Sequence, residues 1–288
     1  MDDTKRTECF ASLYLWIVMN IIPNVPKFLL LFVRYSFIMD MKFWQMGGVS
    51  MGEVITVLSG KGGTGKTSVC AALACALAEE NKRVLCIDCD VGLRNLDISL
   101  GLTDSAALSF LDIAEGGYDL AQATVHPHYP DLHFLTAPMN RPVEKIDISA
   151  FADFIHEARR NFDYIFLDAP AGVDAGFRLV CAAADRFLVV TGPGPAAVRD
   201  AGRMGQVLEL QGKDNIRLIV NRVRPKMIAS MELTVDDVMD QAGLPLLGIV
   251  PEDSNVLFAA VFQEPLLEYT RKGAAAACNR IAGRIKGI

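Results

Sequence analysis

The chain contains a glycine-rich run, Ser59-Gly60-Lys61-Gly62-Gly63-Thr64-Gly65-Lys66-Thr67. It fits the pattern G-x-x-x-x-G-K-T at Gly60, Gly65, Lys66 and Thr67. Glycines let the backbone turn tightly, so that successive N–H groups point at the oxygens of a phosphate. A helix that follows such a turn directs its positive dipole end at the same anion. The run therefore predicts a P-loop, in which Gly60 through Thr67, together with Ser68, bind the phosphates of a nucleotide.

Two side chains of this loop have predicted chemical roles. Lys66 is expected to contact the β- and γ-phosphates, and the hydroxyl of Thr67 is expected to bind Mg²⁺. The alternative is a glycine-rich turn without a ligand. It is disfavoured because the run lies between a predicted strand and a predicted helix, as a P-loop does.

Short apolar runs alternate with helical patterns from Met51 onward. Continuous apolar runs are typical of parallel strands that are covered by helices on both sides. The sequence therefore predicts one α/β domain over residues 51–288, with a doubly wound, mostly parallel sheet and helices on both faces. The predicted strands are Val54–Leu58, Arg83–Ile87, Leu132–Thr136, Tyr164–Leu167, Arg186–Val190, Ile216–Val220 and Leu247–Val250. The predicted helices are Thr67–Glu80, Ile148–Arg160, Ala196–Gln211, Thr234–Ala242 and Leu266–Ile285.

Residues 1–50 differ in character from the rest. Their first apolar stretch, Phe10–Ile22, is shorter than the roughly 20 residues that span a bilayer. The segment Met51-Gly52-Glu53-Val54 resembles the start of a first strand, and Gly47-Gly48 lies where a ribosome-binding sequence can be encoded. We expect residues 1–50 to be a leader, non-native or disordered, without a role in the fold; a genuine membrane anchor is the alternative. Mass spectrometry of the native N-terminus distinguishes the two.

The bulk composition limits the partners. The 288 residues carry a formal net charge of −6, which gives no general attraction to nucleic acid, so no nucleic-acid partner is expected. The seven cysteines lie in apolar segments and are expected to be reduced and packed as small hydrophobic residues, including the C-x-x-C pair Cys86 and Cys89. The spacing of His126, His128 and His133 supplies no complete metal site, so these residues are expected to be solvated loop histidines.

A second predicted strand end supplies the carboxylate that phosphoryl transfer requires. The apolar run Tyr164–Leu167 leads directly into Asp168, which is expected to hold Mg²⁺ through water. The segment Asp168-Ala169-Pro170-Ala171-Gly172 suits a loop that moves with the γ-phosphate, because its glycine lies beside the phosphate site. An ordinary surface turn is the alternative, since D-x-P turns are common.

The second lysine of the P-loop, Lys61, gives the run K-G-G-x-G-K-T. With it, the chain resembles the MinD/ParA family of deviant Walker A ATPases. In that family the first lysine reaches the partner's nucleotide, so the resemblance implies that Lys61 acts in trans in an ATP-dependent homodimer. Lys61, Lys66, Asp90 and Asp168 are then the implied catalytic residues, and ATP and Mg²⁺ the implied ligands.

Further motifs match this family in order along the chain. In the run Asp88-Cys89-Asp90, the resemblance implies that Asp90 orients the attacking water, and Gly92–Asp97 is similar to the MinD branch of the family. Residues near two late strand ends are implied to surround the adenine: Asn221, Arg222, Pro251 and Asp253.

The resemblance implies an ATPase switch that regulates placement of the division site, recruits a MinC-type inhibitor of FtsZ ring assembly and responds to a MinE-like or other activator. A flagellar-number regulator and a ParA-type partitioning ATPase remain alternatives within the superfamily. A metal-cluster carrier of the Mrp type needs a late C-x-x-C, whereas only Cys278 lies there. The expected location is the cytoplasm, with contact at the inner face of the membrane as a further option. The C-terminal stripe of Ile281, Ile285 and Ile288 is expected to be a core contact rather than an anchor.

Overall fold

A computed structural model of the protein describes residues 51–103, 105–139, 141–224 and 234–287. The expected leader, residues 1–50, lies outside these described residues. Within them, a single eight-stranded sheet runs through the centre of the fold.

The strands follow the order β3-β4-β2-β5-β1-β6-β7-β8 across the sheet. Every neighbouring pair is parallel except β3 with β4, which confirms the mostly parallel, doubly wound sheet. The seven predicted strands are all present, and the sequence did not predict β3, which has two residues and lies at the edge. The bounds are β1 Glu53–Leu58, β2 Val84–Asp88, β3 Thr124–Val125, β4 Leu132–Leu135, β5 Tyr164–Asp168, β6 Arg186–Thr191, β7 Ile216–Val223 and β8 Leu246–Pro251.

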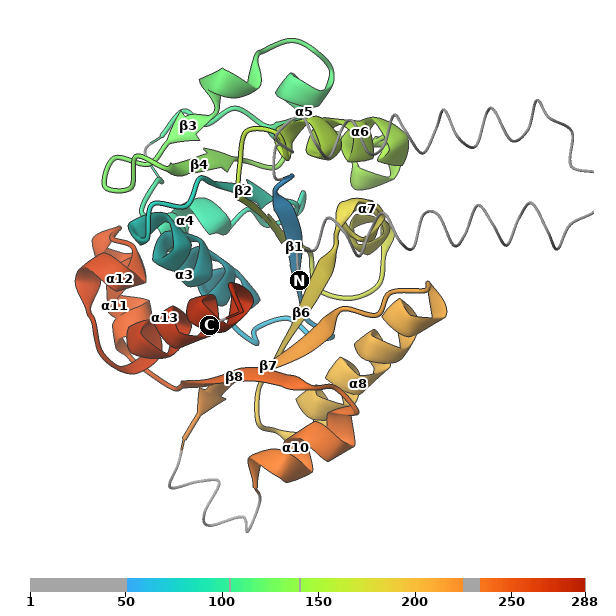
Figure 1. Ribbon diagram of the computed structural model, residues 1–288, viewed down its shortest axis with the longest axis vertical. Coiled ribbons are helices and arrows are strands. Elements are labelled where there is room, and N and C mark those ends of the chain that lie inside the picture. The colour runs from blue at the N-terminus through green and yellow to red at the C-terminus, as the bar shows by residue number, and fades with distance from the viewer. Residues whose placement is uncertain (1–50, 104, 140, 225–233, 288) are drawn as a thin grey trace, which may run out of the picture. The chain divides into compact units, whose positions relative to one another are not determined.

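Helices cover both faces of this sheet (Figure 1). One face carries α3 (Lys66–Glu79), α4 (Leu96–Leu100), α11 (Asn255–Phe262), α12 (Leu266–Tyr269) and α13 (Gly273–Ile285). The other face carries α5 (Phe110–Ala114), α6 (Ile148–Ala158), α7 (Ala175–Ala183), α8 (Pro195–Leu210) and α10 (Val235–Ala242). Two 3₁₀ turns, η1 (Leu120–Gln122) and η2 (Val143–Lys145), lie in the connections. Among the described residues, no helix is long and apolar enough to span a membrane.

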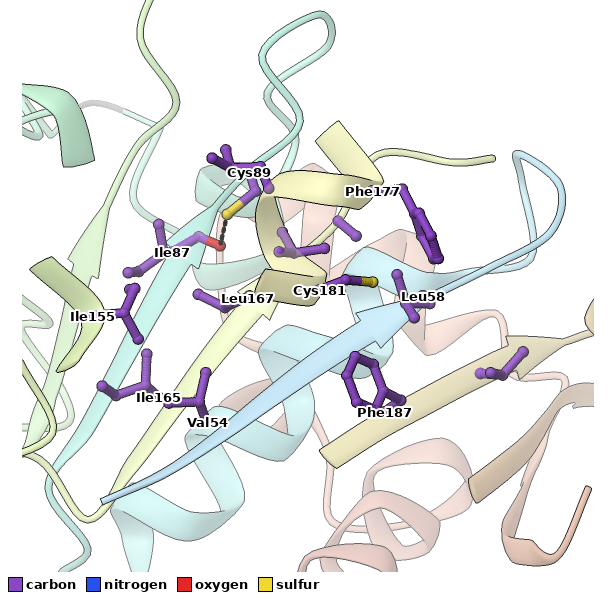
Figure 2. Packing of buried hydrophobic residues seen from close by; sticks show 14 of the residues in the cluster. Val54, Leu58, Ile87, Cys89, Ile155, Ile165, Leu167, Phe177, Cys181 and Phe187 are labelled. Carbon is purple, nitrogen blue, oxygen red and sulfur yellow. Dashed lines mark hydrogen bonds between the residues drawn. The ribbon is translucent and has the colours of Figure 1, made fainter. Parts of the chain in front are cut away.

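The central strand shows why the apolar runs are continuous. Val54 and Leu58 of β1 pack with Phe177 and Phe187 in the core beneath α6, α7 and α8 (Figure 2). Ile55 belongs to the second core, beneath α3 and α13. Successive side chains of a strand point to opposite faces, and here both faces are buried.

This topology gathers the loops that matter for function. The carboxyl ends of parallel strands lie at one edge of the sheet, and open α/β sheets bind ligands at that edge. The loop after β1, the Asp88–Asp90 run after β2 and Asp168 at the end of β5 therefore become neighbours. Two register pairs place them side by side: Val57 with Asp168, and Asp88 with Asp168.

The prediction of one helix over Leu266–Ile285 is wrong, because α12 and α13 are separated by residues 270–272. Gly273 begins α13 with a left-handed φ of +57°, and a Cβ there would collide with the carboxylate of Asp253. That carboxylate accepts a hydrogen bond from Ala274 N at 3.0 Å. A long-range contact with the β8–α11 connection therefore fixes the start of α13. The helices α4, α5, α7 and α11 were not predicted.

The cysteine and histidine expectations have different outcomes. The six cysteines in the described ranges are buried and form no disulfide, as expected. His126 is only 2% exposed, and its Nε2 lies 2.8 Å from the carbonyl oxygen of Leu100, so the expectation of a solvated residue is wrong for this histidine. The expectation of a solvated loop residue is also wrong for His133, which is half-buried in β4 with its ring against that of Phe162. Burial lowers the pKa of His126, which favours the neutral ring in this setting.

The C-terminal stripe is a core contact, as predicted, because Ile281 and Ile285 of α13 pack beneath β8 and α3. Ile288 lies outside the described residues.

Shortening the side chain of Ile281 tests whether it lies in the core. Ile281 is 1% exposed, so Ile281→Ala leaves a cavity and should lower the free energy of unfolding by about 2–5 kcal/mol. The matched change Val261→Ala, on the exposed face of α11 where Val261 is 67% exposed, should cost at most about 0.5 kcal/mol. Urea unfolding measures both, and equal losses would contradict the placement of Ile281 in the core.

Candidate functional site

The glycine-rich loop between β1 and α3 has the backbone shape that the sequence predicts. Gly63 and Gly65 have left-handed φ angles of +79° and +85°. A Cβ at Gly65 would collide with the side-chain amide of Asn221, so this position requires glycine for two reasons.

The end of β7 holds this loop in place. Asn221 Nδ2 donates a hydrogen bond to the carbonyl oxygen of Thr64 at 2.8 Å, and Arg222 donates to that of Gly63 at 2.9 Å. These contacts keep two loop carbonyls turned toward β7. Backbone N–H groups of the loop are then left to face a ligand.

The two residues at the start of the motif lie differently from the rest. Gly60 passes directly beneath α8, where a Cβ would lie 2.5 Å from the carbonyl oxygen of Asp200. Lys61 is exposed, and of the pockets formed by the described residues neither of the two beside the loop includes it. Its ammonium group is therefore available to a neighbouring molecule.

A pocket of about 320 Å³ lies at the N-terminus of α3. Its lining includes residues 62–68 of the loop and first helical turn, with Asp90, Leu93 and Asn95 on the opposite side. Exposed N–H groups and the helix dipole at this end suit an anion such as a phosphate chain.

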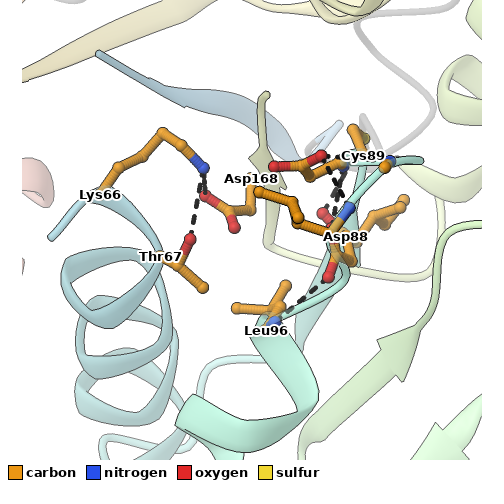
Figure 3. Close-up of polar contacts among 10 residues, drawn as sticks. Lys66, Thr67, Asp88, Cys89, Leu96 and Asp168 are labelled. Carbon is orange, nitrogen blue, oxygen red and sulfur yellow. Dashed lines mark hydrogen bonds and ion pairs between the residues drawn. The ribbon is translucent and has the colours of Figure 1, made fainter. Parts of the chain in front are cut away.

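Lys66 and Asp168 form a buried ion pair behind this pocket (Figure 3). Lys66 Nζ lies 2.5 Å from Asp168 Oδ1 and 3.3 Å from Thr67 Oγ1. Burial raises the pKa of Asp168, and the charge of Lys66 opposes that rise. The ion pair thus offsets part of the cost of burying a carboxylate at a position that is 1% exposed.

Asp88 is a functional residue that the sequence reasoning missed. It is 1% exposed and stands opposite Asp168 in the β2–β5 register. Its Oδ1 accepts a hydrogen bond from Asp90 N at 2.9 Å, and its Oδ2 accepts one from Leu96 N at 3.1 Å (Figure 3). The carboxylate therefore fixes both ends of the loop that carries Asp90. Its place as the first aspartate at a strand end is the signal that could have identified it.

Burial, with a further contribution from Asp168, raises the pKa of Asp88 to about 7. The carboxyl groups of Asp88 and Asp168 thus share one nearby cation, Lys66. A second cation bound here would lower the pKa of both groups.

Asp90 lines the pocket, but its carboxylate is turned toward its own loop. Oδ1 accepts hydrogen bonds from the N–H groups of Gly92 and Leu93, both at 3.2 Å. Both of these hydrogen bonds end on Oδ1, so they hold the side chain in place within the wall of the pocket.

A second pocket, of about 610 Å³, adjoins the first, since Gly65 and Ser68 line both. Asn221, Arg222, Pro251 and Asp253, expected near an adenine, all line it. Apolar side chains supply much of its wall: Val69, Val250, Val256, Leu257, Leu266 and Cys278. A flat apolar ring with polar edges suits such a pocket.

Both carboxylate oxygens of Asp253 accept backbone hydrogen bonds from within the chain. Its Oδ1 accepts a hydrogen bond from Asn255 N at 3.0 Å, and its Oδ2 accepts the bond from Ala274 N. It acts as a support that joins the starts of α11 and α13.

The donor set beside Lys66 fits Mg²⁺. Thr67 offers a hydroxyl and Asp168 a carboxylate, which are the hard oxygen ligands that this ion prefers. Within the described ranges no three His, Cys, Asp or Glu side chains gather at a metal-binding distance. A P-loop site needs no such cluster, because phosphates and water complete the coordination.

The segment after Asp168 is tied to the P-loop strand through its backbone. Gly172, with φ of +93°, donates its N–H to the carbonyl oxygen of Ser59 at 3.2 Å, and Ala169 donates to that of Val57 at 3.2 Å. A shift of the P-loop backbone on nucleotide binding would therefore move residues 169–172 through these two hydrogen bonds.

Comparisons with known proteins agree with this geometry. Residues 55–266 match the model of the CobQ/CobB/MinD/ParA nucleotide binding domain. The chain is 38% identical over 240 residues to the septum site-determining protein MinD of Synechocystis sp., covering 82% of this chain and 90% of that protein.

Two solved structures are also similar. The MinC:MinD cell division protein complex of Aquifex aeolicus contains a chain that is 34% identical, with a TM-score of 0.76 and coverage of 82% of this chain and 96% of that one. The septum site-determining protein MinD of Pyrococcus horikoshii, solved with Mg-ADP, is 28% identical, with a TM-score of 0.72 and coverage of 82% and 96%.

The raised pKa of Asp88 predicts a pH-dependent effect of Asp88→Asn. A carboxyl group whose folded pKa lies near 7, above its unfolded value of 3.8, makes the folded state less stable as pH rises from about 4 to about 7. Relative to the unaltered protein, the variant should therefore gain on the order of 3 kcal/mol between pH 5 and pH 8. Urea unfolding without Mg²⁺ or nucleotide measures this difference.

Asp163→Asn is the control for this experiment. The hydrogen bond from Arg83 lowers the pKa of Asp163, so its contribution to stability is lost only below the usual aspartate range. The difference for this variant should stay constant from pH 5 to pH 8. A constant difference for Asp88→Asn as well would contradict the assigned pKa.

Gly65→Ala should abolish nucleotide binding while the sheet remains folded, because the new Cβ strains a left-handed residue and displaces Asn221. The control Gly212→Ala lies at another left-handed glycine, where a Cβ meets no neighbouring atom. Isothermal titration with Mg-ADP compares the two, and binding that is retained in Gly65→Ala would refute the fit described.

Proposed function

Because this chain belongs to the CobQ/CobB/MinD/ParA family of nucleotide-binding domains, we propose that it is an ATP-hydrolysing switch that regulates placement of the division site. The observation that carries the proposal is the joined pair of pockets with Lys66, Thr67 and Asp168 at one end and Asn221 at the other. Together they fit a nucleotide whose base, phosphates and metal ion occupy successive positions.

The roles of the residues follow from this placement. Lys66 leaves Asp168 and takes the β- and γ-phosphates, while the loop N–H groups of residues 62–66 bind the phosphate oxygens. Thr67 and Asp168 would hold Mg²⁺, the aspartate through water. When bound, Mg²⁺ neutralises phosphate charge and supports the leaving oxygen. Asp90, released from its own loop, orients the attacking water.

Recognition of ATP in particular rests on the second pocket. Asn221 can hydrogen-bond the edge of an adenine, and Pro251 and Val69 can pack against its ring. Arg222 closes the pocket beside the P-loop.

An ATP-dependent homodimer is part of the same proposal. Lys61 is exposed and belongs to the P-loop, but it is not among the residues that line the phosphate pocket of its own chain. In a second copy docked on this face, Lys61 supplies a positive charge to the partner's γ-phosphate. Hydrolysis removes that phosphate and with it the attraction across the interface.

A MinC-type inhibitor of FtsZ ring assembly is the partner we propose, by analogy with the MinC:MinD complex. A MinE-like or other activator is proposed to stimulate hydrolysis. The Gly92–Asp97 run, which forms one wall of the phosphate pocket, favours this function over the flagellar-number and partitioning alternatives. The net charge of −6 also disfavours nonspecific binding to DNA.

We propose the cytoplasm as the place of action, because ATP and Mg²⁺ are the ligands. Ile281 and Ile285 are buried in the core. Peripheral contact with the inner face of the membrane would therefore have to use other residues.

Sedimentation velocity with Mg-ATP tests the switch. The unaltered chain should shift from monomer to dimer in ATP but not in ADP, and Lys66→Ala should remain a monomer in both. Lys61→Ala should bind ATP and remain a monomer. Asp90→Ala should form a persistent dimer that releases phosphate at least about a hundredfold more slowly. A monomer in every nucleotide, with ATP bound, would refute the dimerising switch and leave the ATP site standing.

Binding to the MinC-type protein of the same genome tests the assigned process. The unaltered chain should bind it in ATP with at least about tenfold higher affinity than in ADP, measured by biolayer interferometry. Duplex DNA at low salt serves as the comparison ligand. ATP-dependent binding to DNA, with none to the MinC-type protein, would favour a partitioning function instead.

A further inference from the structure

The short helix α4 forms part of the wall of the phosphate pocket. Ile98 and Ser99 of this helix line the pocket, so the placement of α4 sets the shape of that wall. Leu96 and Leu100 of the same helix are buried in the core beneath α3. A helix of five residues makes few backbone hydrogen bonds of its own, so its position depends on contacts with other parts of the fold.

Two of these contacts come from the side of the nucleotide pockets. At the start of α4, Leu96 N donates a hydrogen bond to Asp88 Oδ2 at the end of β2 (Figure 3). At its end, Gly101 has a left-handed φ of +67°, and a Cβ there would lie 2.5 Å from the carbonyl oxygen of Gln263. The end of α4 therefore packs closely against the residue that follows α11.

His126, in the turn between β3 and β4, makes the third contact. Its Nε2 lies 2.8 Å from the carbonyl oxygen of Leu100, the last residue of α4, and its Nδ1 accepts a hydrogen bond from His128 N at 3.1 Å. A carbonyl oxygen only accepts and a backbone N–H only donates, so these partners fix the tautomer with the proton on Nε2. His126 thus donates to a carbonyl group that has no partner within its own helix.

The imidazole is held firmly, and water does not readily replace it. His126 is 2% exposed, Leu100 is 0% exposed, and the ring centroid of Tyr129 lies 5.0 Å from that of His126. The backbone of His126 is also fixed, because its N–H donates to the carbonyl oxygen of Leu132 in β4 at 2.8 Å. Removing the Nε2 donor would therefore leave a buried carbonyl oxygen unpaired, which is costly.

We propose that His126 is a positioning residue for nucleotide binding, because its hydrogen bond to Leu100 holds α4 in place as a wall of the phosphate pocket. The inference rests on the nucleotide function proposed above, and it adds a residue that lines neither nucleotide pocket. When the bond is lost, the end of α4 moves to satisfy the carbonyl group of Leu100. Ile98 and Ser99 move with it and leave their places beside the phosphates.

Two substitutions separate the two hydrogen bonds of the ring. His126→Gln places an amide N–H near the position of Nε2, so it keeps a donor for Leu100 and loses the acceptor for His128 N. His126→Asn places a carbonyl oxygen near the position of Nδ1, so it keeps that acceptor and is too short to reach Leu100. Isothermal titration of the full chain with Mg-ADP compares them. His126→Asn should bind at least about fivefold more weakly than the unaltered protein, and His126→Gln should stay within about twofold of it.

His156 provides the matched control, because it is exposed on α6, on the other face of the sheet. His156→Asn and His156→Gln should both leave Mg-ADP affinity unchanged. Circular dichroism and urea unfolding confirm that each variant is folded.

Hydrogen exchange reports on α4 without any nucleotide. The amide of Leu102 donates to the carbonyl oxygen of Asp97 at 2.8 Å and closes the end of α4. This amide should exchange at least about fivefold faster in His126→Asn than in the unaltered protein or in His126→Gln. If His126→Asn does not fold, NMR of the unaltered protein decides: the signals of His126 Nε2 and of the Leu102 amide should shift saturably as Mg-ADP binds.

Three results would overturn the inference. They are equal Mg-ADP affinity of the two variants at His126, weaker binding in His126→Gln but not in His126→Asn, and signals of His126 and Leu102 that stay constant while Mg-ADP binds. An unaltered protein that does not bind Mg-ADP would contradict the proposed nucleotide function itself. That failure is distinct, because the three results above are read on a protein that binds the nucleotide.

Discussion

The ion pair between Lys66 and Asp168 is the contact on which the site depends. Both groups are buried, and a buried charge is costly unless an opposite charge accompanies it. A phosphate chain that takes Lys66 leaves the carboxylate of Asp168 without its cation. Mg²⁺ can replace that cation, so the nucleotide and the metal ion are expected to bind together. Through this pair, a nucleotide in the P-loop would change the contacts of Asp168 at the end of β5 and of the segment that follows it.

The parallel sheet explains why this link is short. Lys66 begins the helix after β1, and Asp168 ends the neighbouring strand β5, directly opposite Val57 in the register. On the other side of β5, Asp88 ends β2 and holds the loop that carries Asp90. Three adjacent strand ends therefore position a cation, the carboxylate that we propose as a metal ligand, and the loop that carries Asp90. Displacing Lys66 changes the charge that all of them experience.

Much of this arrangement could be predicted from the sequence. The seven main strands were found because each is a continuous apolar run, and the loop was found because glycine spacing and phosphate binding are tightly connected. The grouping of Asn221 and Pro251 into one pocket came from family resemblance, since residues so far apart in sequence carry no local signal of proximity. Other features depended on three-dimensional contacts. Asp253 fixes the start of α13 by accepting a hydrogen bond from Ala274 N, and the carboxylate of Asp90 turns toward its own loop. Asp88 was overlooked because a spacing of two aspartates does not reveal which one is buried.

A crystal structure of the chain with Mg²⁺ and a non-hydrolysable ATP analogue tests the central claim most directly. The quantity to measure is the distance between Lys66 Nζ and Asp168 Oδ1, which is 2.5 Å in the present structure. We expect that separation to exceed ion-pair range, with Lys66 on the β- and γ-phosphates and Asp168 facing the metal ion through water. A nucleotide bound in the pockets while Lys66 remains paired with Asp168 would contradict the account.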